Sequence, residues 1–233
     1  MKTQWICGDD ASAAGRGLPG QETGGRRTPG VGIIGGTFDP PHIGHLIIAE
    51  AARQALDLDK VFFVPASAQP HKLDRQVTPP LQRWEMVRRA IADNPAFEAS
   101  DLELRRPGPS YTADTVIEIM AQHPGRPLFF ICGADALVEM VTWHRPDRIL
   151  AGAVVAVAGR PGVPGGKTLR QAARHLTGLF GGTILGFGAP MIDVSSTMIR
   201  EIAARGESVR YMVPEGVLAY IRQSGLYLAG IDR

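Results

Sequence analysis

A regular alternation of short apolar runs with amphipathic stretches constrains the fold of this chain more than any other feature. The apolar runs have the length of buried strands, and the stretches between them space their apolar residues as helices do. We therefore expect strands at 31–34, 61–64, 128–132 and 154–158, and helices at 46–56, 81–92, 112–122 and 146–150. Strands that are apolar along their whole length are typical of parallel sheets with helices on both faces. The pattern predicts an α/β fold with a doubly wound, mostly parallel sheet in a single domain.

The two ends of this domain are less regular. Residues 183–194 have the pattern of a weak strand and loop that lead into a helix beginning near Ser196. A last helix at 214–221 begins with proline, which suits the first turn of a helix. Residues 1–29 are rich in glycine, alanine and polar residues and show no periodicity, so we expect a flexible leader before a folded domain at 30–233. A start codon assigned too far upstream would give residues 1–29 the same composition and lack of periodicity.

The composition narrows the class of protein. With 233 residues the chain can bury one core and is expected to hold one active site. Lys and Arg exceed Asp and Glu by only 25 to 23, so there is no large basic field for nucleic acid. The two cysteines, Cys7 and Cys132, do not suggest a disulfide framework, and no apolar run is long enough to span a membrane. These features predict a soluble, cytoplasmic protein with neither nucleic acid nor membrane as a partner.

The first motif with chemical content is GGTFDPPHIGHL, residues 35–46. Its paired glycines let the chain turn tightly and let a phosphate approach the backbone, and an anion-attracting helix N-terminus follows. His42 and His45 are three residues apart, so on a helix they share a face and would point at one phosphate chain. The alternatives are two histidines at the end of a surface helix, or a metal site. No cysteine or carboxylate stands at ligand spacing, so we expect no metal held by the protein itself.

A second candidate anion site lies in VSSTMIR, residues 194–200. Ser196 and Thr197 can cap the following helix or offer hydroxyl groups, and Arg200 can fork toward phosphate oxygens. Taken alone, the segment is typical of a helix cap. Together with the first motif it favours a phosphate site.

Both motifs resemble the signatures of the nucleotidyltransferase superfamily, which shares its Rossmann-like fold with class I aminoacyl-tRNA synthetases. Residues 42–45 spell HIGH behind GGTFDP, and VSSTMIR is similar to the superfamily pattern ISSTxIR. Three more segments narrow the resemblance to the bacterial nicotinate-mononucleotide adenylyltransferases. They are QPHK at 69–72, GPSYTADT at 108–115 and FFICGADALVEMVTWH at 129–144. The closing VPEGVLAYIRQSGLY at 213–227 is also similar to the C-terminal helix of this family. The resemblance covers nearly all of residues 31–228.

This resemblance implies an ATP-binding transferase of NAD biosynthesis. In the family, the phosphate of nicotinate mononucleotide attacks the α-phosphorus of ATP, and the products are nicotinate adenine dinucleotide and pyrophosphate. Mg²⁺ would be carried on the ATP phosphates rather than in a protein cage. The implied catalytic residues are His42, His45, Lys72 and Arg200. The implied ATP contacts are Gly35, Gly36, Thr37, Phe38, His42, His45, Gly133, Asp135, Ser196, Thr197 and Arg200, and the implied acceptor contacts are Lys72, Tyr111, Thr112, Trp143 and Arg160.

The acceptor and ribose contacts also have physical reasons. The helix expected to start at Tyr111 and Thr112 presents free N–H groups, which suit the carboxylate of nicotinate. Asp135 follows a strand-end glycine and can accept hydrogen bonds from the adenosine ribose, with a helix N-cap as the alternative. Trp143 offers a flat face to the charged pyridinium ring, with core packing as the alternative.

The chain departs from the family pattern in two places. His144 stands where the family often carries a second aromatic residue, and the turn at Arg160 lacks the aromatic that usually follows it. The contact of Arg160 with a phosphate and the role of His144 are therefore open. The sequence also leaves open whether the protein forms a homo-oligomer, how it is regulated and what the leader does. It does not show how strictly nicotinate mononucleotide is preferred over its amide.

Three other functions stay as alternatives. A phosphopantetheine adenylyltransferase shares both signatures, but that family is not expected to carry the SYTxDT and GAD…W segments. A class I synthetase would need tRNA-binding domains and a KMSKS-like lysine pair that this chain lacks. A nucleotide sensor would keep the phosphate site without chemistry, and the intact His42, His45 and Arg200 argue against it.

Overall fold

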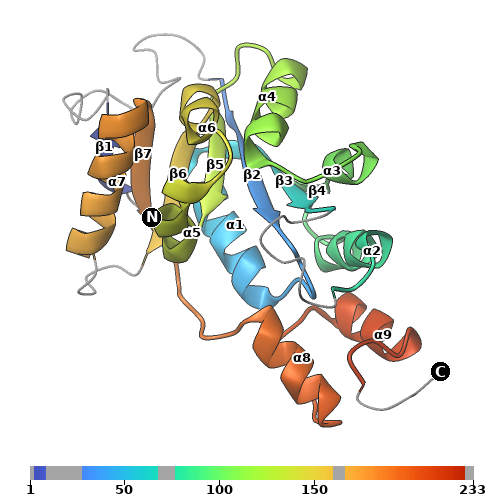
Figure 1. Ribbon diagram of the computed structural model, residues 1–233. Coiled ribbons are helices and arrows are strands. Elements are labelled where there is room, and N and C mark those ends of the chain that lie inside the picture. Colours follow the sequence, from blue (N-terminus) through green and yellow to red (C-terminus); the bar gives the residue numbers. More distant parts are fainter. Residues whose placement is uncertain (1–2, 9–27, 68–76, 160–165, 229–233) are drawn as a thin grey trace. The chain divides into compact units, whose positions relative to one another are not determined.

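The computed structural model describes residues 3–8, 28–67, 77–159 and 166–228 (Figure 1). Its strands are β1 (Thr3–Gly8), β2 (Gly30–Gly36), β3 (Leu58–Pro65), β4 (Phe97–Ala99), β5 (Leu128–Cys132), β6 (Val154–Gly159) and β7 (Thr183–Gly188). They form one sheet in the order β1-β7-β6-β5-β2-β3-β4. β2 pairs in parallel with β5, β5 with β6 and β6 with β7, whereas β1 runs antiparallel to β7. The sheet is therefore mostly parallel, as the apolar runs predict.

The chain divides into two compact units. The first contains Met1–Gly35, Ile48–Phe62 and Tyr111–Met191, and the second contains Gly36–Ile47, Phe63–Ser110 and Ile192–Arg233. α1 (Ile43–Leu56) continues from the second unit into the first. The other helices of the first unit are α4 (Thr112–Gln122), α5 (Ala134–Glu139), the 3-10 helix η3 (Met140–Thr142), α6 (Pro146–Gly152) and α7 (Gly166–Phe180). Those of the second are α2 (Pro80–Ala90), α3 (Leu102–Arg105), α8 (Ser196–Ala204) and α9 (Glu215–Gln223).

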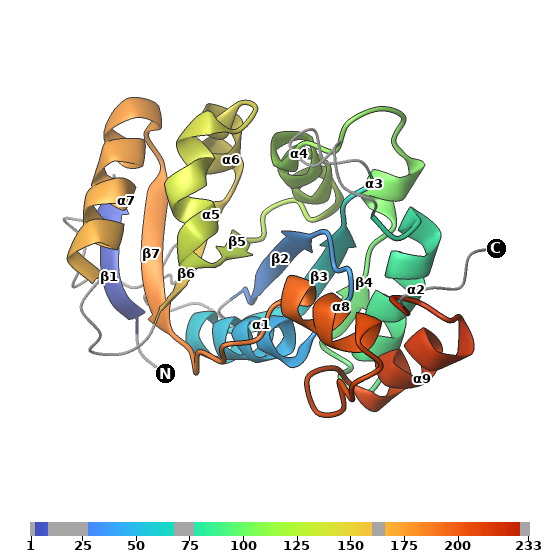
Figure 2. The same cartoon turned by 60° about the horizontal axis from the view of Figure 1, so that its bottom comes forward.

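In the first unit, helices cover both faces of the sheet. Figure 2 shows α1 on one side of β2 and β5, and α4 and α6 on the other. α4 buries Ala113, Val116 and Ile119, whose spacing keeps them on one face, and it packs against α6. Every residue of β5 is buried, because the strand has helices on both sides. The prediction of a doubly wound α/β fold is confirmed.

In the second unit, α2 packs against β4 and α9 (Figure 1). It begins at Pro80, where the missing N–H of proline costs no helical hydrogen bond. The guanidinium of Arg89 lies 4.7 Å from the ring centroid of Tyr220, a cation–π contact that joins α2 to α9. The buried face of α2 consists of Arg83, Met86, Val87 and Ala90. Arg83 is thus a charged residue in a core position and requires buried partners.

The predicted elements lie where the sequence places them, within a few residues at their ends. α4 and β5 have the predicted bounds, and α8 begins at Ser196. The sequence does not predict β4, α3, α5 and η3, because each is too short to show a period. It also misses α7, which begins at Gly166. No helix in the described ranges is both long and apolar enough to cross a bilayer.

The expectation that the first 29 residues stay outside the fold is wrong for Thr3–Gly8, which form β1. This strand extends the sheet at its edge by pairing with β7. Trp5 lies so close to Gly186 that a side chain there would meet the indole at 2.4 Å. A single short strand is recognisable only through its partner, so pattern analysis misses it. The leader from residue 9 to residue 27 lies outside the described part of the chain, and its boundary with the domain stays a prediction.

Deletion of residues 1–8 is expected to destabilise the protein and to leave kcat nearly unchanged, because β1 contributes none of the predicted site residues. The loss of Cys7 and part of Trp5 from the packed edge corresponds to about 2 kcal/mol. Thermal unfolding should therefore show a melting temperature lower by roughly 4–8 °C. The variant Gly186→Ala keeps the strand but displaces Trp5, so it should also lower the melting temperature. Unchanged melting in both variants would show that β1 does not stabilise the fold.

Candidate active site

The turn that follows β2 carries Gly36, Thr37 and Phe38. Phe38 has a left-handed backbone (φ 50°) and a side chain that is only 1% exposed. Its ring meets the ring of His45 edge-on, with centroids 5.0 Å apart, and lies against Phe63. A ring buried in this way faces the interior, and the predicted contact of Phe38 with ATP stays a prediction. Its role is to support His45 from the interior.

His42 and His45 lie together at the start of α1. The helix begins at Ile43, so His42 precedes it and His45 stands in its first turn. The two ring centroids are 3.7 Å apart, and the ring planes are tilted by 33°. The main-chain N–H of His42 donates to Nδ1 of His45 at 3.1 Å. The proton of a neutral His45 ring is therefore on Nε2, which leaves an N–H donor on the other side of the ring.

The glycine of the HIGH signature has a steric role. A Cβ atom on Gly44 would lie 3.0 Å from Nδ1 of His42, so a side chain there would crowd the imidazole. Nδ1 of His42 is buried and has no hydrogen-bond partner among the described residues. Such an unpaired atom costs about 1–3 kcal/mol. The protein keeps His42 in this place at a cost to stability, which favours a functional role for the ring.

Both imidazoles are neutral near pH 7 in the nucleotide-free protein. Burial lowers the pKa of His42 from 6.5 to about 4, and burial together with the neighbouring His42 lowers the pKa of His45 to about 3. Because both rings are neutral, they can lie in contact without repulsion between two positive charges. A bound triphosphate would raise both pKa values, since an anion favours the protonated form.

These pKa values predict how stability depends on pH. Below pH 6.5 the unfolded chain binds protons on both rings, whereas the folded protein resists protonation until about pH 4, so stability falls as the pH is lowered through this range. Equilibrium unfolding of the nucleotide-free wild type and of His42→Asn should show a steeper decline for the wild type. NMR titration of the two rings supplies the direct measurement. A midpoint near 6.5 for either ring would contradict the prediction.

The residues of the second signature surround the N-terminus of α8. Oγ of Ser195 accepts the N–H of Met198 at 3.2 Å and caps the helix. The capping role predicted for Ser196 and Thr197 therefore belongs to Ser195. Oγ of Ser196 instead donates to the main-chain oxygen of Pro40 at 2.8 Å. This bond ties α8 to the turn that leads to the histidines.

Arg200, in the same helix, is tied to the same turn. Nη1 donates to the main-chain oxygen of Asp39 at 2.7 Å, and Nη2 donates to Oγ1 of Thr197 at 3.2 Å. The side chain is half-buried, and its guanidinium has more N–H groups than these two contacts use. The remaining donors can serve a phosphate.

Main-chain N–H groups at the two helix starts add further donors. Those of Gly44, Ser196 and Thr197 have no hydrogen-bond partner within the described residues. The N-terminal ends of α1 and α8 also carry the positive end of each helix dipole. The second unit thus offers imidazole, guanidinium and amide donors of the kind that bind a phosphate chain.

A buried polar network that motif analysis misses lies beside this turn. The carboxylate of Asp39, 4% exposed, accepts the hydroxyl of Tyr227 at 2.6 Å and the N–H of Thr78 at 3.2 Å. Burial, followed by the charge of Asp39, raises the pKa of Tyr227, so its hydroxyl stays protonated and donates. Arg83 donates to three main-chain oxygens nearby. The only sign of this network in the sequence is the place of Arg83 on the otherwise apolar face of α2.

In the first unit, two predicted ATP contacts lie at strand ends. Gly35 lies near the end of β2 and Gly133 directly follows β5, at the carboxyl edge where open α/β sheets bind ligands. Asp135 is exposed in the first turn of α5 and makes no capping hydrogen bond. The helix-cap alternative for Asp135 is therefore wrong, and its contact with ribose stays a prediction.

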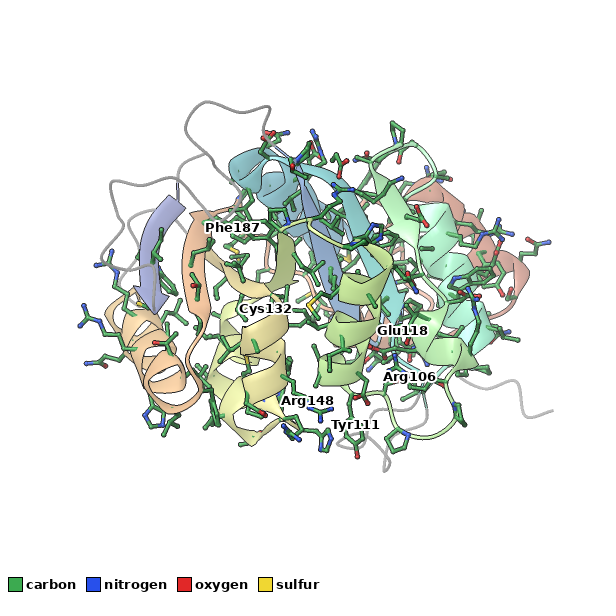
Figure 3. All side chains as sticks on the ribbon, turned by 90° about the horizontal axis from the view of Figure 1, so that it is seen from above. Arg106, Tyr111, Glu118, Cys132, Arg148 and Phe187 are labelled. Atoms are coloured by element: carbon green, nitrogen blue, oxygen red, sulfur yellow. The ribbon has the colours of Figure 1, made fainter. Side chains whose placement is uncertain are left out.

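An aromatic cluster lies at the start of α4. Tyr111 is the N-cap residue of this helix, and Figure 3 shows it at the end of α4. Its ring stacks on that of His144, with centroids 4.2 Å apart and planes tilted by 31°. Trp143 is half-buried and contacts Phe130 edge to face at 6.0 Å. The N–H of Thr112 has no partner among the described residues. His144 thus supplies a flat ring where the family often has an aromatic residue.

Two predicted residues, Lys72 and Arg160, lie outside the described residues, so their contacts stay predictions. Within the described ranges, no group of three or more His, Cys, Asp or Glu side chains is arranged to hold a metal ion. The structure brings together the second-unit candidates Gly36, Thr37, His42, His45, Ser196, Thr197 and Arg200, and it brings Tyr111 beside the residue that follows Trp143.

Sequence comparison decides the family. Residues 33–202 match the cytidylyltransferase-like family. The chain is 44% identical over 197 residues to a protein of Desulfitobacterium hafniense strain Y51 named "Probable nicotinate-nucleotide adenylyltransferase", an alignment that covers 84% of this chain and 95% of the relative. The chain belongs to the nicotinate-nucleotide adenylyltransferase family. A relative of the same name from Thermus thermophilus is 43% identical over 84% of this chain and 98% of its own length.

Structural comparison agrees with this family at the level of the fold. The nicotinic acid mononucleotide adenylyltransferase of Plasmodium falciparum, solved with NaAD, matches 86% of this chain and 98% of its own with a TM-score of 0.69 at 16% identity. Nicotinate-nucleotide adenylyltransferases are nucleotidyltransferase enzymes, so the sequence-based prediction of an enzyme of this class is confirmed.

Proposed function

We propose that the protein transfers the adenylyl group of ATP to nicotinate mononucleotide, forming nicotinate adenine dinucleotide and pyrophosphate in NAD biosynthesis. The observation that carries this proposal is the pair of neutral, stacked histidines tied to the same turn as Arg200. Relatives at 43–44% identity bear the name of this activity over almost their whole length. The same names favour it over phosphopantetheine adenylyl transfer.

The reaction needs positioning and charge stabilisation rather than a protein nucleophile. A phosphate oxygen of the acceptor forms a bond to the α-phosphorus of ATP, and the bond from that phosphorus to the pyrophosphate oxygen breaks. Nε2–H of His45 donates to phosphate oxygens whose negative charge grows during transfer. Arg200 and the free N–H groups of α8 bind the departing pyrophosphate, and His42 helps to bind the triphosphate. Lys72 is assigned to the same phosphates.

The acceptor and the ribose are assigned to the first unit. The N–H of Thr112, at the positive end of α4, receives the carboxylate of nicotinate. Tyr111, backed by His144, borders the ring, and Trp143 stacks on the pyridinium. Asp135 accepts from the adenosine ribose. Gly35 and Gly133 let the nucleotide approach the backbone, and Arg160 is assigned to the acceptor phosphate.

Mg²⁺ enters the proposed reaction with ATP. Oxygen ligands suit this ion, and in phosphoryl-transfer sites it usually keeps substrate phosphates and water as ligands. The donors of the second unit are imidazole, guanidinium and N–H groups, which suit phosphate rather than the ion. We place the reaction in the cytoplasm, where the free and buried Cys7 and Cys132 stay reduced.

The decisive assay offers the purified protein ATP, Mg²⁺ and a set of acceptors and measures pyrophosphate release, with the product identified by mass. We expect turnover with nicotinate mononucleotide and weaker turnover with its amide, because the start of α4 favours a carboxylate. Turnover with phosphopantetheine alone would support the alternative enzyme. Tight ATP binding without pyrophosphate release from any acceptor would support a nucleotide sensor.

Trp143→Ala is expected to raise the KM for nicotinate mononucleotide with little change for ATP, because the ring is assigned to the pyridinium. Stacking of this kind contributes about 0.5–2 kcal/mol, which corresponds to a roughly two- to thirtyfold change in KM. Trp143→Phe keeps a flat ring and should recover part of the loss. A rise in KM for ATP alone would show that the indole contacts the other nucleotide.

A further inference from the structure

Arg83 is the least exposed charged residue in the described part of the chain, at 1% exposure. Nε donates to the main-chain oxygen of Thr78 at 2.7 Å, Nη1 to that of Thr37 at 2.7 Å and Nη2 to that of Ser67 at 3.1 Å. All three acceptors are main-chain carbonyls. The guanidinium therefore holds backbone segments together rather than pairing with one side chain.

Stability alone does not explain a charge in this place. Burial lowers the pKa of Arg83, whereas Asp39, Tyr227 and Glu103, which face it from other elements of the second unit, raise it, and the guanidinium stays charged. Placing such a cation in a core costs several kcal/mol, and an apolar side chain of similar volume is often no less stable. The fork of Arg83 must therefore provide something that an apolar residue would not.

What the fork provides is the position of the turn at residues 37–40. Thr37, held by Arg83, precedes Phe38, whose ring lies against His45. Two residues after Thr37, the main-chain oxygen of Asp39 accepts Arg200. A shift of this turn would move the supports of His45 and Arg200 together.

We infer that Arg83 is a positioning residue for the adenylyl transfer proposed above, on which this inference rests. It contacts neither nucleotide. Arg83 holds the carbonyl of Thr37 close to those of Ser67 and Thr78 and so fixes the position of the turn. The turn then fixes the positions of the imidazole of His45 and the guanidinium of Arg200. Misplacing catalytic groups by about 1 Å can lower a rate up to about a hundredfold.

Arg83→Lys tests this inference, because it keeps the charge but replaces the planar fork with a point donor that cannot serve all three carbonyls. We expect kcat to fall about tenfold while the KM for the acceptor stays unchanged. The NMR signals of the His45 ring in the nucleotide-free protein should shift, since the ring loses its fixed support.

Arg126→Lys is the matched control in the first unit. Arg126 also donates its fork to main-chain oxygens, those of Pro29 and Gly30, and pairs with Asp59. We expect the melting temperature to fall in both Arg126→Lys and Arg83→Lys. Only Arg83→Lys should change kcat and the NMR signals of His45. An equal fall of kcat in both variants, or an unchanged kcat and His45 signal in Arg83→Lys, would overturn the inference.

Two further arms keep the test decisive. If Arg83→Lys does not fold, Tyr227→Phe removes the hydroxyl that Asp39 accepts and keeps the ring. It should lower kcat and shift the His45 signals, and the inference fails if neither changes. If the wild type does not turn over nicotinate mononucleotide, the proposed function fails, while the His45 signals still report whether Arg83 positions the ring.

Discussion

His45→Ala is expected to lower kcat about 10²–10³-fold, roughly 2.7–4 kcal/mol, with little change in the dissociation constant for ATP. Nδ1 of His45 is occupied by the N–H of His42, so Nε2–H is the donor left for phosphate. A donor that meets charge as it develops in the transition state affects kcat more than binding. Steady-state kinetics on folded protein, with ATP affinity measured separately, supply the comparison.

Two conservative variants separate the functions of the two ring nitrogens. His45→Gln retains an N–H donor near the position of Nε2 and should keep part of the activity. His45→Asn retains an acceptor near the position of Nδ1, which can hold the N–H of His42, but should be as inactive as His45→Ala. Phe38 loses a ring contact in every variant, so some loss of melting temperature is expected in all three. A kcat near that of the wild type in folded His45→Ala would contradict the catalytic role of His45 and support the alternative function of a nucleotide sensor.

Arg200→Ala is the second large effect, with kcat/KM for ATP expected to fall about 10²–10³-fold. The guanidinium combines a charge for the phosphates with a bond to the carbonyl of Asp39, and both are lost. Arg200→Lys keeps the charge without the fork and should lose about tenfold, since a point donor satisfies only part of this geometry.

The control for Arg200 lies at the end of the same helix. Arg205 is exposed and pairs with Glu207, so Arg205→Ala removes a positive charge near the C-terminus of α8 without touching the turn. Its kcat/KM should match that of the wild type. If both alanine variants lose activity to the same degree, the loss reflects the general field of the protein and not a contact made by Arg200.

The fold class follows from the sequence because strands buried on both faces must be apolar throughout. Leu128–Cys132 is the clearest case, since all its residues are apolar in the sequence and all are buried in the structure. The helix Thr112–Gln122 is equally predictable from the spacing of its buried residues. β1 is not predictable in this way, because its six residues show no pattern of their own and form a strand by pairing with β7.

The candidate site divides in the same way. The sequence determines the chemistry, because HIGH and VSSTMIR supply imidazole, hydroxyl and guanidinium groups whose identities do not depend on the fold. Which of these groups is free for a ligand depends on distances that no spacing along the chain reports. Ser195 rather than Ser196 caps α8, Phe38 packs against the ring of His45, and His144 stacks on Tyr111.

The tertiary structure also decides which residues hold the site in place. Arg83 stands 46 positions from the carbonyl of Thr37 that it binds, and Tyr227 stands 188 positions from the carboxylate of Asp39. The need for glycine at position 44 is visible only in the structure, where a Cβ atom would lie 3.0 Å from Nδ1 of His42. Burial and contacts between distant segments set these roles, and burial also lowers the pKa of His42 and His45. The sequence by itself therefore determined the fold class, the family and the candidate groups of the site, while only folding decided the protonation, the free donors and the supports of those groups.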